Sequence, residues 1–376
     1  MTRRPSLAID ARALWGSGIG RYMREITRGL VSLGKFDLIR LVGDPKELEP
    51  FVEILESGAT ASKVDIVALK GGRYSPRAQA GWSALLAHGD VADVTFFPHW
   101  DVPLLRFPTR SVVTIHDLIH LRVKGATSPA RRVLARRMIT RAVDEATRMI
   151  AVSAFSRDDL IAEFPAAAGR IEAVPSGVST LFAQKAQSLN AVSADIRRPY
   201  LLCVANRKPH KNLIAAVEVL AQLVPTHQTL RLVCVGEHFP EWKRTIARAR
   251  ELGVEDRIVD LGAIPDETLH SLYANAAVYL HPSRYEGFGF PVLEAMASGA
   301  PVVASNTTSI PEIAGTAATL VDPDDYPAMS AAVAVMLDKR ATRDRASAAG
   351  KIQAARFSWE SAVLSTQRIL LEAAAL

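Results

Sequence analysis

The chain has little cysteine and lacks any apolar run long enough to cross a membrane. Of its 376 residues only Cys203 and Cys234 are cysteines, and both lie in apolar stretches typical of buried strands. We therefore interpret them as core residues and not as a disulfide, redox or metal site, which favours a reducing, cytoplasmic compartment. No apolar segment reaches the roughly 18–20 residues of a membrane-spanning helix. The start, MTRRPSLAIDARALW, is basic without a long apolar region, so no secretory signal is expected.

Positive charge is present in excess, but only in one half of the chain. The net charge is +6, and residues 1–180 carry 25 Lys and Arg against 19 Asp and Glu, whereas residues 181–376 carry 20 of each. The N-terminal half is therefore expected to meet an anionic partner, such as phosphate groups or anionic lipid.

The segment 122–148 concentrates this charge, with eight basic residues and two acidic ones. From Arg131 to Arg141 the basic residues alternate with apolar ones at helical spacing. A basic amphipathic helix can dock on an anionic membrane surface, and a solvated charged face is the alternative interpretation. Nucleic-acid binding is not expected, because no aromatic or base-reading residues accompany the charges.

Short apolar runs alternate with longer helical patterns along the whole chain, which predicts an α/β protein with parallel sheets. Expected strands are 6–10, 38–43, 64–69, 94–98, 111–117, 147–153, 198–206, 230–237, 257–264, 276–283, 300–305 and 317–322. The pattern restarts after a polar segment, 181–198, which we interpret as a linker. Two doubly wound domains follow, 1–185 and 198–358, with a helix at about 360–376. Ligands of such folds bind at the carboxyl ends of the strands.

The segment RYEGFGFPVLEAMASG places two acids around an apolar, glycine-containing loop. A strand precedes it, and Pro291 and Gly299 suit the start and end of a helix. Glu286 should lie just past the strand end, and Glu294 is expected in the first turn of the helix. Exposed backbone N–H groups at such a helix start favour an anion or a hydroxyl-rich ligand, whereas a capped helix behind a plain surface loop is the alternative.

The stretch E-GFGFPVL-E followed by AMASGAPVVAS resembles the E-x7-E signature of the family 4 retaining glycosyltransferases. The resemblance implies the GT-B fold: two Rossmann-like domains facing a cleft, with a C-terminal helix that returns to the first domain. It also implies a nucleotide-sugar site in which Glu286 and the following backbone meet the sugar and phosphate, while Glu294 holds the ribose hydroxyls. Matching segments occur in order along nearly the whole chain, among them LVCVGE and SIPEIAG.

The stretch CVANRKPHKNL resembles the family's basic loop. Lys211 matches the lysine that binds the donor diphosphate. Many members have an arginine directly after a glycine here; this chain has Ala205-Asn206, and Arg207 one position later is the expected substitute. Fixed cations beside a leaving diphosphate stabilise the charge that develops as the glycosidic bond breaks. A solvated basic turn is the alternative.

Donor contacts are implied for a larger set, which includes backbone near the base and a glycine loop in the first domain. These residues are Gly18, Ile19, Gly20, Asn206, Arg207, Lys211, Gly236, Ile264, Glu286, Gly287, Phe288, Gly289, Phe290, Leu293 and Glu294. The glycine loop, WGSGIG, is spaced G-x-G-x-G and lacks the later acidic residue of a dinucleotide-binding fingerprint, so a nicotinamide dehydrogenase is not favoured.

Two histidines end strands in the N-terminal half. His116 and Asp117 match the family's HD motif, and the resemblance implies that the histidine lies near the transferred sugar, where it positions groups and stabilises charge. His99 and Asp117 are candidate acceptor contacts. The expected catalytic group is thus His116, Glu286, Lys211 and Arg207.

The expected activity is retaining transfer of a sugar to a glycan or polyprenyl-linked hydroxyl, with mannose from GDP-mannose as the first interpretation. The GIGRY loop with HKN resembles bacterial mannosyltransferases of O-antigen and exopolysaccharide synthesis. No DxD element stands in a suitable place, so no metal or other cofactor is expected. A UDP-sugar donor, a sugar-nucleotide 2-epimerase and an inactive GT-B scaffold remain alternatives.

Overall fold

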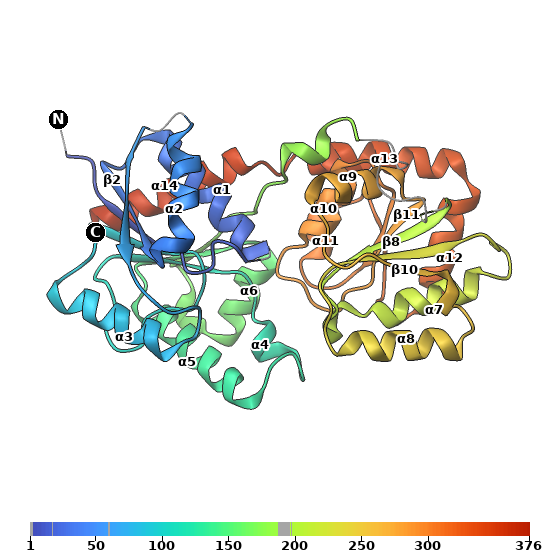
Figure 1. The fold of residues 1–376 in the computed structure, drawn as a ribbon, viewed down its shortest axis with the longest axis horizontal. Coiled ribbons are helices and arrows are strands. Elements are labelled where there is room, and N and C mark those ends of the chain that lie inside the picture. The colour runs from blue at the N-terminus through green and yellow to red at the C-terminus, as the bar shows by residue number, and fades with distance from the viewer. Residues whose placement is uncertain (1–2, 17, 59–60, 187–195, 197) are drawn as a thin grey trace. The chain divides into compact units, whose positions relative to one another are not determined.

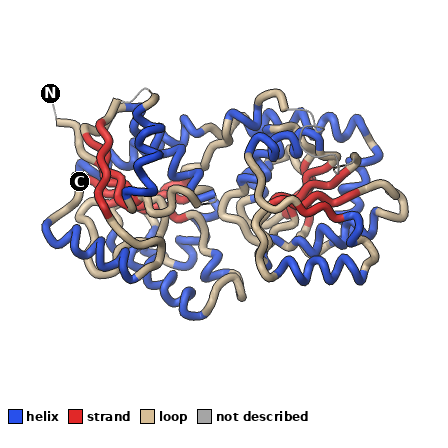
Figure 2. Tube along the Cα trace, viewed as in Figure 1, coloured by secondary structure: helices blue, strands red, loops and turns tan. Residues whose placement is uncertain are grey.

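The computed structural model describes residues 3–16, 18–58, 61–186, 196 and 198–376. They form two compact units, each with its own parallel sheet flanked by helices (Figures 1 and 2). The N-terminal unit comprises residues 1–122, 127–177 and 359–376, and the C-terminal unit comprises 123–126 and 178–358. Most of the polar segment expected to be a linker, 187–195 and 197, lies outside the described residues, and its first part contains a short 3-10 turn, Thr180–Ala183.

The N-terminal sheet has seven parallel strands in the order β3-β2-β1-β4-β5-β6-β7. Its strands are β1 Leu7–Asp10, β2 Leu38–Gly43, β3 Lys63–Ala68, β4 Val94–Phe97, β5 Ser111–Ile115, β6 Arg148–Ala151 and β7 Ile171–Ala173. Its helices are α1 Gly18–Leu33, α2 Pro45–Glu56, α3 Pro76–Leu85, α4 Ile119–Arg122, α5 Pro129–Glu145, α6 Ala154–Glu163 and α14 Trp359–Ala375. Strand β7 is missing from the expected set because its three half-buried residues give no apolar run.

The C-terminal sheet has six parallel strands in the order β10-β9-β8-β11-β12-β13. Its strands are β8 Tyr200–Val204, β9 Arg231–Val235, β10 Ile258–Asp260, β11 Val278–His281, β12 Val302–Ser305 and β13 Thr319–Val321. Its helices are α7 Leu213–Leu223, α8 Glu241–Glu251, α9 Asp266–Asn275, α10 Phe290–Ala297, α11 Ile310–Ala314, α12 Tyr326–Asp338 and α13 Arg340–Ala354. All the strands expected from the sequence are present, and the doubly wound α/β class is confirmed in both units.

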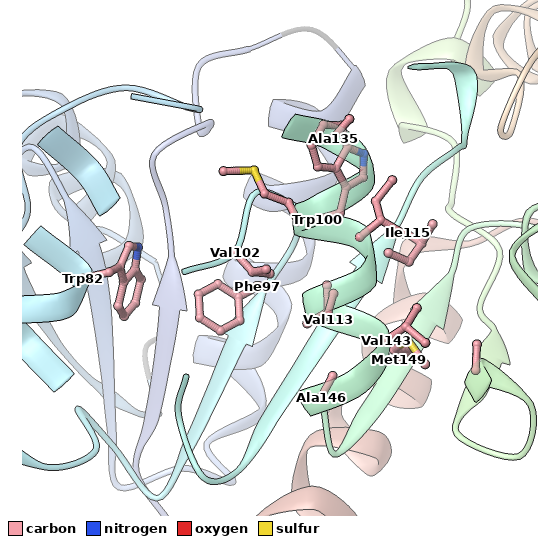
Figure 3. Close-up of a cluster of buried hydrophobic side chains, with 14 of the residues drawn as sticks. Trp82, Phe97, Trp100, Val102, Val113, Ile115, Ala135, Val143, Ala146 and Met149 are labelled. Carbon is pink, nitrogen blue, oxygen red and sulfur yellow. The ribbon is translucent and has the colours of Figure 1, made fainter. Parts of the chain in front are cut away.

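Each unit has its own hydrophobic core. In the N-terminal unit, side chains of α3 and α5 pack on the sheet around Trp82, Phe97 and Met149 (Figure 3). In the C-terminal unit, α7 and α12 cover one face of the sheet, and this core includes Cys203 and Cys234. Both thiols are buried and free, as expected for core cysteines.

The strand orders show where, in each sheet, the direction in which successive strands are added reverses. In the N-terminal sheet the chain runs outward from β1 through β2 and β3, then restarts on the other side of β1 with β4. In the C-terminal sheet the same reversal falls between β8 and β11. Loops at the carboxyl ends of strands diverge at such switch points and leave room for a ligand. Gly18 and His99 follow the strands at the first of these positions, and Lys211 and Glu286 follow those at the second.

The described part of the chain contains no helix that is both long and apolar enough to cross a membrane.

Candidate functional site

Lys211 and Glu286 meet at the switch point of the C-terminal sheet. Lys211 ends the short turn that follows β8, and Glu286 lies in the loop after β11. The Lys211 ammonium Nζ donates to Glu286 Oε1 at 2.7 Å and to Oε2 at 2.8 Å. Residues 75 positions apart in sequence are thus joined because parallel neighbouring strands deliver their loops to one edge.

The loop from Glu286 to Gly289 is held by hydrogen bonds from the segment before α11. Ser309 Oγ donates to the carbonyl oxygens of Glu286 and Phe288, at 3.0 and 2.7 Å. The Glu286 N–H donates to Thr308 Oγ1 at 3.0 Å. Gly289 precedes α10 with φ +117°, a conformation that L side chains rarely adopt. The expected strand-to-helix loop is therefore present, with a fixed backbone.

Glu294 does not lie where the sequence suggested. Because α10 begins at Phe290, its first turn holds no acidic residue, and Glu294 is the fifth residue of the helix. The carboxylate is 4% exposed and accepts a hydrogen bond from the Tyr273 hydroxyl at 3.2 Å. A capping role in the first turn is thus excluded. Pro291 in the first turn and Gly299 after the helix, at φ +83°, are as expected.

Glu286 is buried in an environment that keeps it ionised. Burial by itself would raise its pKa, but the positive charge of Lys211 and a hydrogen bond from His281 outweigh this and hold the pKa well below its usual range. His281 Nε2 lies 3.1 Å from Glu286 Oε1. His281 falls within the strand expected at 276–283, and its position at the strand end, five residues before Glu286, is the sequence signal for its role.

Arg207 is fixed within the C-terminal unit. Its side chain is 1% exposed; the guanidinium pairs with Asp260 and donates from Nη1 to the Gly236 carbonyl at 3.1 Å. The guanidinium carbon also lies 4.1 Å from the ring centroid of Trp242. The structure therefore brings Lys211 to Glu286 but ties Arg207 to Asp260, in a pair that the sequence analysis missed.

A pocket of about 140 Å³ opens beside the loop between β8 and α7. It is lined by Arg207, Lys208, Pro209, Asn212, Leu213, Ile214, Glu241, Thr245, Arg284 and Tyr326. Neither Lys211 nor Glu286 belongs to this lining. The pocket and the Lys211–Glu286 pair are therefore separate features of this edge of the sheet.

Three further donor candidates, Asn206, Gly236 and Ile264, follow β8, β9 and β10, whereas Leu293 lies in α10. The Gly236 N–H donates to the Gly262 carbonyl at 2.7 Å, and Gly236 has φ +132°. Asn206 Oδ1 is buried and accepts no hydrogen bond from any described residue. Ile264 is half-buried in the loop before α9, while Leu293 is fully buried inside α10. The Leu293 side chain therefore packs in the interior and helps to fix α10 in place.

In the N-terminal unit, His116 directly follows β5 and is 8% exposed. Its Nε2 donates to the Pro98 carbonyl oxygen at 2.8 Å, which anchors the imidazole on the loop after β4. Burial lowers the pKa of His116, and the hydrogen bond to Pro98 and the charge of Asp117 oppose it only in part. A neutral imidazole is suited to form hydrogen bonds and does not supply a fixed positive charge. Asp117 Oδ1 accepts the Ile119 N–H at 2.9 Å and so shapes the turn into α4.

His99 belongs to a buried polar cluster that the sequence analysis missed. Its Nδ1 accepts a hydrogen bond from the Asp101 N–H at 3.0 Å. Burial is the main reason that the pKa of the His99 ring lies well below its usual value. Arg12 forms two buried ion pairs, with Asp10 at 2.6 Å and with Asp101 at 3.3 Å. Burial raises the pKa of Asp101 to about 6 despite Arg12. Asp10 is the last residue of β1 and Arg12 follows it, so strand-end position was the available signal.

The glycine loop of this unit packs tightly at the start of α1. Helix α1 begins at Gly18, and Ile19 lies half-buried in its first turn. A Cβ placed on Gly20 would lie 2.6 Å from the Leu14 carbonyl oxygen and 2.9 Å from that of Ala13. Gly20 is thus required for the approach of α1 to its preceding loop, whatever it binds.

The basic segment 131–141 lies in α5. Met138 and Ile139 are buried in the core, and Val133 is exposed. Arg136 pairs with Glu163 at 2.5 Å and Arg141 with Glu145 at 2.8 Å. Most of the apolar side of the helix is therefore used within the unit, and membrane contact stays a prediction. Among the described residues no group of three or more His, Cys, Asp or Glu could hold a metal ion.

Comparisons with known proteins agree with this architecture. Residues 16–181 match the family model described as Glycosyltransferase Family 4, and residues 186–353 match the model described as Glycosyl transferases group 1. The O-antigen chain mannosyltransferase B of Escherichia coli is 29% identical over 374 residues, which cover 93% of this chain and 94% of that protein.

Two solved structures share the fold. Sucrose-phosphate synthase from Thermosynechococcus elongatus superposes with a TM-score of 0.76 at 20% identity, covering 98% of this chain and 99% of that one. HepE from Anabaena, in complex with UDP and glucose, gives 0.73 at 18% identity, with 98% and 100% covered. The two family models together span most of the chain, and the chain belongs to family 4 of the glycosyltransferases, with the GT-B fold. It is a glycosyltransferase.

Proposed function

We propose that the protein is a retaining mannosyltransferase that moves mannose from GDP-mannose to a hydroxyl of a glycan or polyprenyl-linked saccharide. The observation that carries the donor site is the Lys211–Glu286 pair, 2.7 Å apart at the switch point of the C-terminal sheet. The choice of mannose is supported by the similarity to the O-antigen chain mannosyltransferase B of Escherichia coli.

In the proposed reaction the donor bond breaks as the nucleoside diphosphate leaves, and the acceptor oxygen bonds to the same face of the sugar. The acceptor proton passes to an oxygen of the leaving phosphate, so no separate carboxylate nucleophile is needed. Lys211 stabilises the negative charge that develops on the diphosphate. Glu286 orients the Lys211 ammonium and meets the sugar hydroxyls, while Glu294 holds the ribose at the other end of the donor.

The N-terminal unit is proposed to position the acceptor. His116 is held by the Pro98 carbonyl and is suited to hydrogen-bond the transferred sugar, while His99 and Asp117 are the proposed acceptor contacts. We further propose that the reaction needs no metal, that the protein works in the cytoplasm, and that the basic face of Arg131–Arg141 touches an anionic membrane surface.

One observation favours a second candidate donor. HepE, which shares the fold, is in complex with UDP and glucose, so a UDP-sugar is the alternative within the same reaction class. A sugar-nucleotide 2-epimerase or an inactive scaffold of the same fold would differ in outcome: the first converts the donor without acceptor, and the second converts nothing.

Thermal unfolding in the presence of GDP, UDP, GDP-mannose and UDP-glucose tests the donor site. A nucleotide at 100 times its Kd should stabilise the protein by about 2.7 kcal/mol. We expect GDP and GDP-mannose to raise the Tm, and Lys211→Ala or Glu294→Ala to abolish the shift. Lys243→Ala, which changes an exposed lysine of the same unit, should leave it intact. A melting curve that no nucleotide moves would overturn the proposal.

A further inference from the structure

The two glutamates of the donor site are joined inside the C-terminal unit by three buried side chains. We propose that Tyr273, Tyr279 and His281, which we call the buried bridge, are positioning residues that make Glu286 and Glu294 act as one unit when the donor binds. The inference rests on the proposed function and adds to it three residues that hold the two ends of the site together.

The bridge starts on the central strand. Tyr279 and His281 are alternate residues of β11, so their side chains leave the same face of the sheet. The Tyr279 hydroxyl lies 3.0 Å from His281 Nδ1, and the other ring nitrogen, Nε2, lies 3.1 Å from Glu286 Oε1. One imidazole therefore connects the strand to the carboxylate that holds Lys211.

The second half of the bridge reaches the other acid. Tyr273, on α9, stacks edge-on against Tyr279 with ring centroids 5.3 Å apart. Burial raises the pKa of the Tyr279 phenol well above its usual value, the charges of Glu286 and Glu294 add to this, and a side-chain hydrogen bond with Tyr273 opposes it. The Tyr273 hydroxyl then donates to Glu294 Oε2 at 3.2 Å. A continuous chain of polar contacts thus runs from Glu286 to Glu294.

The chain is shielded from water. Tyr273 and Tyr279 are fully buried and His281 is 2% exposed, while the two glutamates are 8% and 4% exposed. Hydrogen bonds in such a setting are stronger than in water, and a partner left unpaired there is costly. The position of one carboxylate is therefore sensitive to a change at the far end of the chain.

The five side chains are joined in series, in the order Glu286, His281, Tyr279, Tyr273 and Glu294. Each phenol has a single hydrogen to donate, so each tyrosine of the series depends on its neighbours for its hydrogen bonds. Removing either hydroxyl leaves a buried neighbour without its contact.

The test uses the full-length protein, two hydroxyl deletions that keep the aromatic ring, and one replacement of the imidazole. Tyr273→Phe, Tyr279→Phe and His281→Gln are compared for the Kd of GDP and UDP by calorimetry, and for kcat of donor turnover. Tyr273 hydrogen-bonds Glu294, yet Tyr273→Phe should lower kcat about tenfold as well as weaken nucleotide binding. His281 contacts Glu286, yet His281→Gln should raise the nucleotide Kd about tenfold as well as lower kcat. Tyr279→Phe, which touches neither acid, should do both.

Tyr200→Phe is the matched control. Tyr200 is also fully buried in this unit, and its hydroxyl donates to the Leu272 carbonyl at 2.7 Å and not to a side chain of the bridge. This variant should lose a similar amount of thermal stability while its Kd and kcat stay within about twofold of the parent values. A purely structural contribution of the bridge predicts that Tyr279→Phe behaves like Tyr200→Phe, and that result would overturn the inference.

The outcomes separate the inference from the proposed function. If the parent protein binds neither GDP nor UDP, the donor site itself is wrong. If the parent binds a nucleotide, but Tyr273→Phe changes only the Kd and His281→Gln changes only kcat, the site stands and the bridge does not join its ends. Changes in both quantities for all three variants support the bridge.

Discussion

Lys211 serves both the fold of the C-terminal unit and the proposed chemistry. Its ammonium group pairs with a carboxylate that is 8% exposed, and both side chains are largely buried. Breaking such a pair by removing one partner is costly because the other charge stays buried, whereas removing both charges can be nearly neutral. Stability and activity should therefore respond differently to single and double changes at this site.

The first prediction uses this difference. Lys211→Met should lower the free energy of unfolding by about 3 kcal/mol, since Glu286 is left without its cation. The double variant Lys211→Met/Glu286→Gln should recover much of that loss, measured by urea denaturation, but should remain inactive in sugar transfer. Recovery of both stability and transfer would show that the pair has no part in the reaction.

The second prediction concerns pH. The pKa of Glu286 is lowered in the folded protein from its ordinary value of 4.5, so the stability it contributes is complete above about that pH and is lost as the pH falls further. The difference in unfolding free energy between the parent and Glu286→Gln should therefore be constant from pH 7 to 5 and shrink on acidification below 4.5. Glu49→Gln, at an exposed carboxylate of α2, is the control. A difference that grows on acidification would contradict the assignment.

At the scale of elements, helix starts determine where the site residues lie. Helix α10 begins at Phe290 because Gly289 can adopt φ +117°, and this moves Glu294 out of the first turn and into contact with Tyr273. In the N-terminal unit, α1 begins beside the backbone of Ala13 and Leu14, which only a glycine at position 20 allows. Both starts depend on a glycine for a steric reason.

The third prediction concerns Gly20 at the start of α1. Gly20→Ala places a methyl group against two backbone carbonyl oxygens, which cannot move aside as a flexible side chain would. The variant should lose about 1–3 kcal/mol of stability, as overpacked sites do. Gly72→Ala is the matched control, because a Cβ there meets nothing within 4 Å. Equal stability of the two variants in chemical denaturation would contradict the tight approach of α1.

On the scale of the whole molecule, the two units are not two consecutive segments of the chain. The last helix, α14, belongs to the N-terminal unit, where it packs along α1 and over β4, β5 and β6. Tyr22 of α1 lies 6.3 Å from Trp359 at the start of α14, between ring centroids. The N-terminal unit therefore includes residues 359–376, which follow the C-terminal unit in sequence.

The fourth prediction tests this membership. Leu370 of α14 is fully buried, and Leu370→Ala should destabilise the N-terminal unit by about 2–4 kcal/mol. In scanning calorimetry one transition should move to lower temperature, and the transition that a nucleotide raises should be the other one. The exposed neighbour Leu364, changed to alanine, should move neither. A nucleotide-dependent transition that shifts with Leu370→Ala would contradict the assignment of α14.

The sequence by itself determined the α/β class, twelve strands and the family motif. These depend on local periodicity and on residues close together in the chain, such as Glu286, Gly289 and Glu294, and local patterns are set by the backbone geometry of helices and strands. It also assigned Lys211 and Glu286 to one donor site, through their match to the family's motifs.

Only the tertiary structure decided which side chains complete the site. The partners of Glu286 and Glu294, the tie between Arg207 and Asp260, and the cluster of Asp10, Arg12 and Asp101 all join residues through space, and packing determines which polar groups are buried together. A buried polar group must find a partner wherever the fold supplies one. That partner is set by distances between elements, which no local pattern encodes.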